Sequence, residues 1–273
     1  MRLGLIAGNG TFPFLVLRAA RQLGHDVTVV AIKNEAFDGL EALAAEVGGT
    51  TVQWIGLGQL GKCIDHLREA GVSSAVMAGQ VKHVKLFTDV MPDLTMLGVL
   101  SRLRSKNTDA LISGIADALQ KHGITLMDST SLLGELLARP GVLSRAAPSD
   151  AMRADFEFGY RVADAVAGVD IGQTIVVKER AVVAVEAMEG TDATIARGGA
   201  LAGAGTRVVK VAKPAQDMRF DVPVVGVATI TAMQAAGADG ISIDAGRTLV
   251  LDGDAFLAAA DAAGIVVVGR ERA

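Results

Sequence analysis

The sequence has few cysteines and few aromatic side chains, and these shortages narrow the class of protein. Cys63 is the single cysteine, so no disulfide can form within the chain, and we expect a protein of the reducing cytoplasm. Aromatic residues make up only 4% of a chain that is 51% hydrophobic. A core built from Ala, Val, Leu, Ile and Gly favours α/β layers over a β-sandwich.

Long apolar runs and dense positive charge are also missing. No uninterrupted apolar run approaches the ~18 residues of a membrane-spanning helix, so we expect a soluble protein, at most peripheral to a membrane. The formal net charge is −4, and no dense run of Lys and Arg could neutralise a phosphate backbone. We therefore expect no nucleic-acid partner.

The chain opens with a pattern typical of a parallel sheet. Apolar runs at 3–7 and 27–32 flank a glycine-rich turn at 8–10 and an amphipathic helix at 14–23, which predicts a β-α-β unit. Glycines at such a turn let backbone N–H groups approach a phosphate at the helix N-terminus. The turn lacks the third glycine of a dinucleotide fingerprint, and the second strand ends without the acid that holds a ribose. Phosphate binding at Gly10 and an ordinary tight turn both stay open.

A second glycine-rich loop follows the buried strand predicted at 74–78, and it contains Gly79 and Gln80. In open parallel sheets ligands lie beyond the carboxyl ends of the strands, so Gly10, Gly79 and Gln80 could line one crevice. The repeated alternation of strands and helices predicts an N-terminal Rossmann-like domain with a parallel sheet over residues 1–135.

Residues 84–103 are rich in Leu, Met and Phe and are interrupted by Pro92. Flexible, polarizable methionines suit an adaptable apolar surface, for instance one that holds an acyl chain. Packing in the core is the alternative interpretation of the same composition.

A boundary between two domains is predicted where the periodic pattern stops. Residues 136–150 contain two prolines and no clear period, so we expect a linker there. Residues 151–273 then alternate apolar runs with helical patterns, which predicts a C-terminal α/β domain with a mixed sheet. Ser149 or Asp150 can cap the first helix of that domain.

A β-hairpin that ends in acids is the most unusual stretch of the second half. Two β-branched runs, at 174–177 and 182–185, flank a polar turn. Glu186, Glu189 and Asp192 follow within seven residues. Three carboxylates so close together repel one another, so we expect water, a cation or a ligand beside them.

A second polar segment occupies residues 213–223. Its acids are Asp217 and Asp221, and its basic residues include Lys213 and Arg219. Such a mixture can hold a metal and a phosphorylated ligand together, with carboxylates on the cation and basic groups on phosphate oxygens. A solvated, salt-bridged loop is the alternative.

Several strings together resemble the LpxI-type UDP-2,3-diacylglucosamine pyrophosphatases. They occur in the expected order over almost the whole chain: 3–13, 58–62, 78–81, 170–173, 184–193, 213–223 and 245–246. The resemblance implies hydrolysis of UDP-2,3-diacylglucosamine to UMP and 2,3-diacylglucosamine 1-phosphate (lipid X), a step of lipid A biosynthesis. It also implies a divalent cation, usually Mg²⁺, water attack on the β-phosphorus, and a substrate held between two domains. Asp221 matches the acid regarded as essential in such enzymes.

The resemblance leads to a hypothesis for each group of site residues. Cleavage of a pyrophosphate by water needs neutralised oxygens, an oriented nucleophile and a proton acceptor. We expect Asp221, Asp192 and Glu189 to be catalytic and Asp221, Asp217 and Glu189 to bind the metal. The expected substrate contacts are Gly10, Gly79, Gln80, Gln173, Thr191, Lys213, Gln216 and Arg219.

Two other functions stay open from the residues alone. A dinucleotide-dependent oxidoreductase would use the first glycine-rich turn, although the missing ribose acid counts against it. A non-catalytic module that binds a sugar nucleotide or a lipid would keep the glycine loops but need no acids. We also expect a homodimer, from base rates, and peripheral contact with the cytoplasmic face of the inner membrane.

Overall fold

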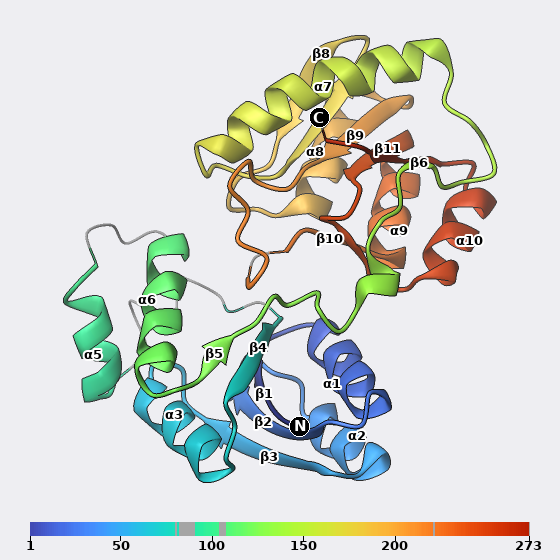
Figure 1. Ribbon diagram of the computed structural model, residues 1–273. Helices are drawn as coiled ribbons and strands as arrows, with labels where there is room; N and C mark the ends of the chain where they lie inside the picture. The colour runs from blue at the N-terminus through green and yellow to red at the C-terminus, as the bar shows by residue number, and fades with distance from the viewer. Residues whose placement is uncertain (80, 82–90, 104–107, 221, 273) are drawn as a thin grey trace. The chain divides into compact units, whose positions relative to one another are not determined.

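The chain folds into two compact units, residues Met1–Leu133 and Gly134–Ala273. We describe each by itself, from a computed structural model (Figure 1). The structure describes residues 1–79, 81, 91–103, 108–220 and 222–272. Gln80 and Asp221, which the sequence analysis assigns to the site, lie outside the described residues, as do residues 84–90 of the Leu- and Met-rich stretch.

A five-stranded parallel sheet in the order β3-β2-β1-β4-β5 forms the centre of the first unit. The central strand is buried almost throughout, because helices cover both faces of the sheet. The order reverses between β1 and β4, which makes this the switch point where ligands bind in such sheets. The strands are β1 (Arg2–Ala7), β2 (Asp26–Ile32), β3 (Thr50–Ile55), β4 (Ser74–Ala78) and β5 (Thr125–Leu126).

Helices lie on both sides of this sheet (Figure 1), α1 and α2 on one side and α3, α5 and α6 on the other. Pro13 lies in the first turn of α1, where its missing N–H costs no hydrogen bond. Asp93 caps α5, because its side chain accepts a hydrogen bond from the Met96 amide at 2.8 Å. The bounds are α1 (Phe12–Gln22), α2 (Gly39–Val47), α3 (Leu60–Glu69), α5 (Leu94–Leu100) and α6 (Thr108–Lys121).

A six-stranded mixed sheet in the order β6-β13-β11-β9-β7-β8 forms the centre of the second unit. The strands β9, β11 and β13 are parallel to one another. The other three strands are antiparallel to a neighbour: β6 to β13, β7 to β9, and β8 to β7. The strands β10 (Val224–Val225) and β12 (Leu249–Val250) form a separate, short, two-stranded parallel sheet. The six strands are β6 (Gly141–Val142), β7 (Thr174–Lys178), β8 (Ala181–Val185), β9 (Thr206–Lys210), β11 (Ala238–Asp244) and β13 (Val266–Arg270).

The long helix α7 (Asp150–Gly168) covers one face of this sheet, and α8, α9 and α10 cover the other (Figure 1). Two hydrophobic clusters match these layers, one around Phe156 of α7 and one around Phe256 of α10. Ser149 caps α7 by accepting a hydrogen bond from the Met152 amide at 3.2 Å. The remaining bounds are α8 (Thr191–Ala202), α9 (Val227–Ala236), α10 (Asp254–Ala262) and a 3₁₀ turn at Gly134–Leu136.

The predicted α/β class, with a parallel sheet in the first unit and a mixed sheet in the second, is confirmed. The predicted hairpin is also present, as β7 and β8. Residues 136–150, expected as a linker, pack on the second unit. Within them β6 pairs with β13, and the Ala138 amide donates to the Thr248 carbonyl. None of the described helices is both long and apolar enough to cross a membrane.

Candidate functional site

One edge of the six-stranded sheet collects most of the polar residues predicted for the site. Three parallel strands, β9, β11 and β13, end at this edge, where Asp244 is the register partner of Arg270. The strand β7 begins there, because Thr174 pairs with Lys210 in the register. We call this the carboxyl edge. The strand β8 also ends at this edge. Segments that are distant in the sequence meet there because their strands are neighbours in the sheet.

Glu186 lies in a buried hydrogen-bond network at the carboxyl edge. Its carboxylate accepts from the Gln173 amide at 3.1 Å and from the Thr191 hydroxyl at 2.8 Å. The ammonium group of Lys210, itself only 7% exposed, donates to that same hydroxyl at 2.6 Å. A buried carboxylate and a buried ammonium are thus joined through Thr191, the first residue of α8. This network brings together the predicted contacts Gln173 and Thr191.

Glu189, predicted as a catalytic and metal-binding acid, forms an ion pair with Arg197 at 2.5 Å. It also accepts from the Ala187 amide at 3.0 Å. A hydrogen bond from its own backbone amide and the bond from Arg197 lower the pKa of Glu189 to about 2. Asp192 is exposed in the first turn of α8, where the helix dipole favours a negative charge. The three crowded acids are therefore compensated by groups of the chain itself.

The polar loop, residues 212–220, starts at the same edge. Lys213 pairs with Asp170 at 2.6 Å, and Arg219 binds Asp217 through both Nε and Nη2. The Arg219 bond lowers the pKa of Asp217. Both cations predicted to contact phosphate therefore have acidic partners in this structure.

The described residues do not form a metal site. No group of three or more His, Cys, Asp or Glu side chains comes together among them. Two predicted ligands, Glu189 and Asp217, are each bound to an arginine, and a cation would have to displace it. The third, Asp221, lies in the part that the structure does not describe. The carboxylates of the described residues thus do not by themselves form a donor set that fits a divalent cation.

An acidic and basic cluster that the sequence interpretation missed lies beside the loop. Asp244 is fully buried and accepts from Arg270 Nε at 2.7 Å. Arg270 also binds Asp164 of α7 through both terminal nitrogens, at 3.1 and 3.0 Å. Arg272 reaches Asp164 at 3.3 Å. One sequence signal was available, since Asp244 directly follows the strand predicted at 240–243, as Glu186 follows the strand predicted at 182–185.

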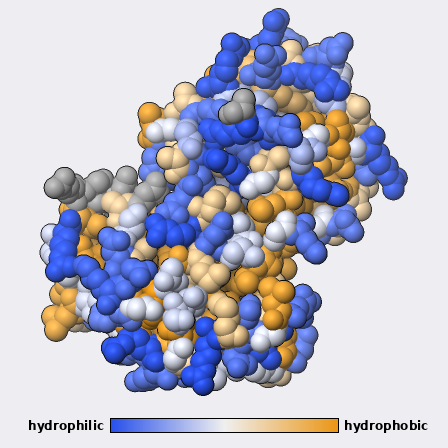
Figure 2. Space-filling view, in the orientation of Figure 1, coloured by the Kyte–Doolittle hydropathy of each residue, from blue (hydrophilic) through white to orange (hydrophobic). Residues whose placement is uncertain are grey.

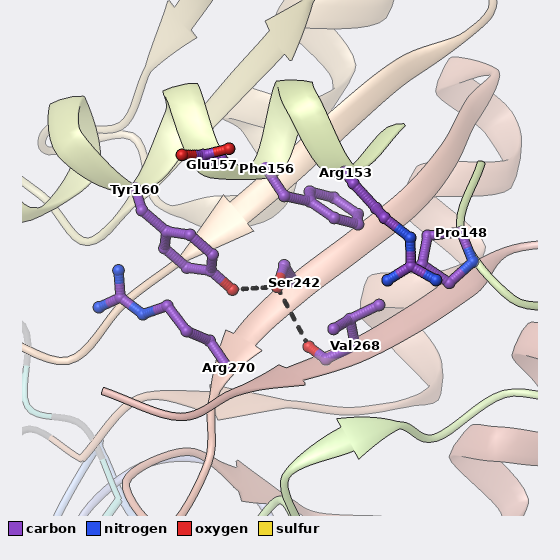
Figure 3. A pocket seen from close by; sticks show the side chains of 8 residues that line it. All are labelled: Pro148, Arg153, Phe156, Glu157, Tyr160, Ser242, Val268 and Arg270. Carbon is purple, nitrogen blue, oxygen red and sulfur yellow. Dashed lines mark hydrogen bonds between the residues drawn. The ribbon is translucent and has the colours of Figure 1, made fainter. Parts of the chain in front are cut away.

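A cavity of about 270 Å³ lies between α7 and the strands β11 and β13 (Figure 3). The Tyr160 hydroxyl is hydrogen-bonded to Ser242, and the Arg270 guanidinium lies 3.7 Å from the centre of the Tyr160 ring. Burial raises the pKa of Tyr160. None of the residues predicted for the site lines this cavity, whose walls are Pro148, Arg153, Phe156, Glu157, Tyr160, Ser242, Val268 and Arg270.

In the first unit, the predicted glycines lie at the switch point of the parallel sheet. The Gly8 amide donates to the Ala78 carbonyl at 2.9 Å, so the loops after β1 and β4 run side by side. Gly79 has a φ of +88°, and a Cβ there would lie 2.5 Å from the Asn9 carbonyl oxygen. Gly10 has a φ of +97°, and a Cβ there would meet no atom within 4 Å. The two predicted substrate contacts Gly10 and Gly79 thus belong to neighbouring loops.

Both units match known sequence families. Residues 2–136 match the model of the LpxI N-terminal domain, and residues 139–268 match that of the LpxI C-terminal domain. The chain belongs to the LpxI family. The boundary between the two LpxI domains falls within a few residues of the boundary between the two structural units.

A relative from Caulobacter vibrioides covers the same length. It is named UDP-2,3-diacylglucosamine pyrophosphatase LpxI, and it is 35% identical over 280 residues. The match spans 98% of this chain and 97% of the relative. The carboxyl edge, the polar loop and the buried cluster around Asp244 all lie within the LpxI C-terminal domain, and the glycine loops lie within the LpxI N-terminal domain.

Proposed function

We propose that this protein hydrolyses the pyrophosphate of UDP-2,3-diacylglucosamine, giving UMP and 2,3-diacylglucosamine 1-phosphate for lipid A biosynthesis. The observation that carries the proposal is the similarity to the Caulobacter relative over nearly the full length of both chains. A non-catalytic binding module would not need the acids at the carboxyl edge, and the Caulobacter relative is named as a pyrophosphatase and not as an oxidoreductase.

In the proposed reaction a water oxygen forms a bond to the β-phosphorus as the bond from that phosphorus to the bridging oxygen breaks. UMP leaves with the bridging oxygen, and the water oxygen stays in the sugar phosphate. The protein must orient the water, accept its proton and balance the charge on the phosphate oxygens. We assign orientation of the water to Asp221.

The basic residues of the polar loop supply the positive charge in this proposal. Arg219 holds Asp217 through two nitrogens at 2.9 to 3.0 Å and 2.5 Å, a geometry that also suits two phosphate oxygens. Lys213 lies at the entry of the same loop, paired with Asp170. When the substrate binds, phosphate oxygens would take the place of these carboxylates.

A need for Mg²⁺ is a separate part of the proposal. The described acids do not form a cation site. Adding EDTA to the assay measures this requirement directly, because a metal-dependent enzyme loses UMP release with the chelator and regains it with excess Mg²⁺.

The exposed apolar residues near α5 support a lipid substrate and contact with a membrane surface. Met91, Leu94 and Leu97 are 94%, 87% and 47% exposed. Figure 2 shows apolar surface over α5 at the edge of the first unit. We propose that this surface contacts acyl chains. Sedimentation with phospholipid vesicles should weaken when Leu94 and Leu97 are both replaced by Gln, whereas replacement by Gln of the exposed Leu201, in α8 of the second unit, should have no effect.

The decisive assay follows UMP release from UDP-2,3-diacylglucosamine. We expect turnover by the wild type and a loss of at least about 10²-fold in Asp221→Asn, because the orienting carboxylate is gone. Asp65→Asn, an exposed acid of α3, serves as the control and should keep full activity. In H₂¹⁸O the label should enter the sugar phosphate and not UMP. No release of UMP by the wild type would refute the proposed function.

A further inference from the structure

The first residue of the polar loop is bound to a buried carboxylate. The Ala212 amide donates to Asp244 Oδ2 at 2.9 Å, and both residues are fully buried. A carboxylate removed from water needs compensation, which the Arg270 guanidinium supplies at 2.7 Å on the other oxygen. The position where the loop leaves β9 is therefore fixed by an acid from the end of β11.

Arg272 binds the same residue, Ala212, as a donor, whereas Asp244 binds it as an acceptor. Its Nη1 donates to the Ala212 carbonyl at 3.0 Å and lies 3.5 Å from the Lys213 carbonyl. Its charge is balanced by Asp164 at 3.3 Å and by Asp244 at 3.7 Å. The amide and the carbonyl of Ala212 are thus both bound by charged side chains, and charge-assisted bonds are about twice as strong as neutral ones.

Gln216 connects this entry to the far end of the loop. Its side-chain oxygen accepts from the Lys213 amide at 3.1 Å, and its side-chain nitrogen donates to the Phe220 carbonyl at 3.2 Å. The entry, the middle and the last described residue before Asp221 therefore form one hydrogen-bonded body. A shift at Ala212 would be passed on to Phe220.

We propose that Asp244 and Arg272 are positioning residues, which hold the entry of the polar loop so that its basic residues Lys213 and Arg219 stay in place for the phosphate oxygens. Neither residue is assigned a contact with the substrate. They act through the backbone of Ala212 and Lys213, and Arg270 and Asp164 keep the pair electrically balanced. The inference rests on the proposed function for its effect on turnover, whereas its effect on the loop itself is independent of any activity.

Variants at Arg272 test the inference, since this side chain is 23% exposed and its loss leaves the core intact. In Arg272→Gln we expect faster amide hydrogen exchange in residues 212–220 and no change in β7 and β8. The kcat for UMP release should fall about tenfold to a hundredfold with little change in KM, because small displacements of catalytic groups have effects of this size. Arg272→Lys keeps a charge that can reach one carbonyl, so it should recover most of the lost kcat.

Arg207→Gln is the matched control. Arg207 is a similarly buried arginine of the same sheet, paired with Asp155 at the other end of β9. Below its melting temperature this variant should keep the wild-type kcat and the wild-type exchange in residues 212–220. The inference is overturned if exchange in 212–220 is unchanged in Arg272→Gln, if it rises equally over the whole second unit, or if kcat stays at the wild-type level. A wild type that releases no UMP overturns the proposed function, and the exchange result alone then decides whether Arg272 holds the loop.

Discussion

Glu189 shows how an acid predicted to need a cation is stabilised by the chain. Its carboxylate accepts bonds from the Ala187 amide and from Arg197. These bonds favour the charged form, as a bound metal would. The sequence places Glu189 three residues after Glu186 but does not show that Arg197, two turns along α8, faces back toward it.

The first prediction concerns the titration of Glu189. Its pKa is lowered to about 2 by its own backbone amide and by Arg197, so the stabilising contribution of the charged form is complete above the ordinary glutamate value. This contribution should be lost progressively as the pH falls from the ordinary glutamate value through about 2. An NMR titration of the Glu189 carboxyl carbon measures the midpoint. In Arg197→Gln the midpoint should move up toward the ordinary value, and an unchanged midpoint would contradict the assigned cause.

At the scale of elements, the hairpin β7–β8 depends on a side chain from α7. Its two-residue turn, Glu179 and Arg180, has φ values of +51° and +59°, a conformation that usually needs Asn or Gly. Buried Asp155 accepts from both turn amides, at 3.1 and 2.6 Å, and pairs with Arg207 at 3.0 Å. One carboxylate thus satisfies two backbone donors and a buried cation.

The second prediction is that Asp155→Ala lowers the free energy of unfolding by roughly 3–5 kcal/mol, because it removes the acceptor of both turn amides and one of the two carboxylates that pair with Arg207, the other being that of Asp239. Chemical denaturation measures the loss. Asp150→Ala, an exposed acid in the first turn of the same helix, is the control and should cost under about 1 kcal/mol. A similar loss in both variants would mean that the hairpin does not depend on Asp155.

The third prediction compares the two glycines at the switch point of the first unit. Both have positive φ, so alanine adds backbone strain of about 1 kcal/mol at either position. At Gly79 the new Cβ would also meet the Asn9 carbonyl oxygen at 2.5 Å, whereas at Gly10 it would meet no atom within 4 Å. Gly79→Ala should therefore lower the melting temperature more than Gly10→Ala does. Equal shifts would show that the loops after β1 and β4 do not approach so closely.

Local patterns predicted the strands, the hairpin and the carboxylates beyond a strand end. Alternation and β-branched runs identify strands from neighbouring residues, and the βα repeat identifies the parallel sheet. Pairings across long stretches could not be predicted in this way. Asp155 with the turn at 179–180, and Asp244 with the Ala212 amide, depend on which strands become neighbours. The order of the strands is a property of the folded sheet, and a short sequence motif does not predict it.

At the scale of the whole molecule, each unit has its own sheet and its own covering helices. Residues Met1–Leu133 form the five-stranded parallel sheet with helices on both faces, and Gly134–Ala273 contain the six-stranded mixed sheet with two hydrophobic clusters. Because the boundary lies between residues 133 and 134, β6 belongs to the second unit, whose strand β13 it pairs with.

The fourth prediction is that residues 134–273, expressed alone, fold cooperatively. A fragment that starts at residue 151 lacks β6 and the Ser149 cap of α7, so it should be less stable. Thermal unfolding followed by circular dichroism compares the two fragments. Equal stability would show that residues 134–150 contribute nothing to the second unit.

The expected homodimer stays a prediction. Analytical sedimentation of the full chain tests it.

The turn at Glu179 and Arg180 also has a consequence for the order of folding. With neither Asn nor Gly, these two residues have little tendency to adopt a positive φ before the rest of the unit is present. The acceptor that holds them lies some 25 residues earlier in the sequence, on a helix that must already be packed against the sheet. The hairpin should therefore close late, after α7 has docked, and the polar residues that follow β8 should reach the carboxyl edge only then.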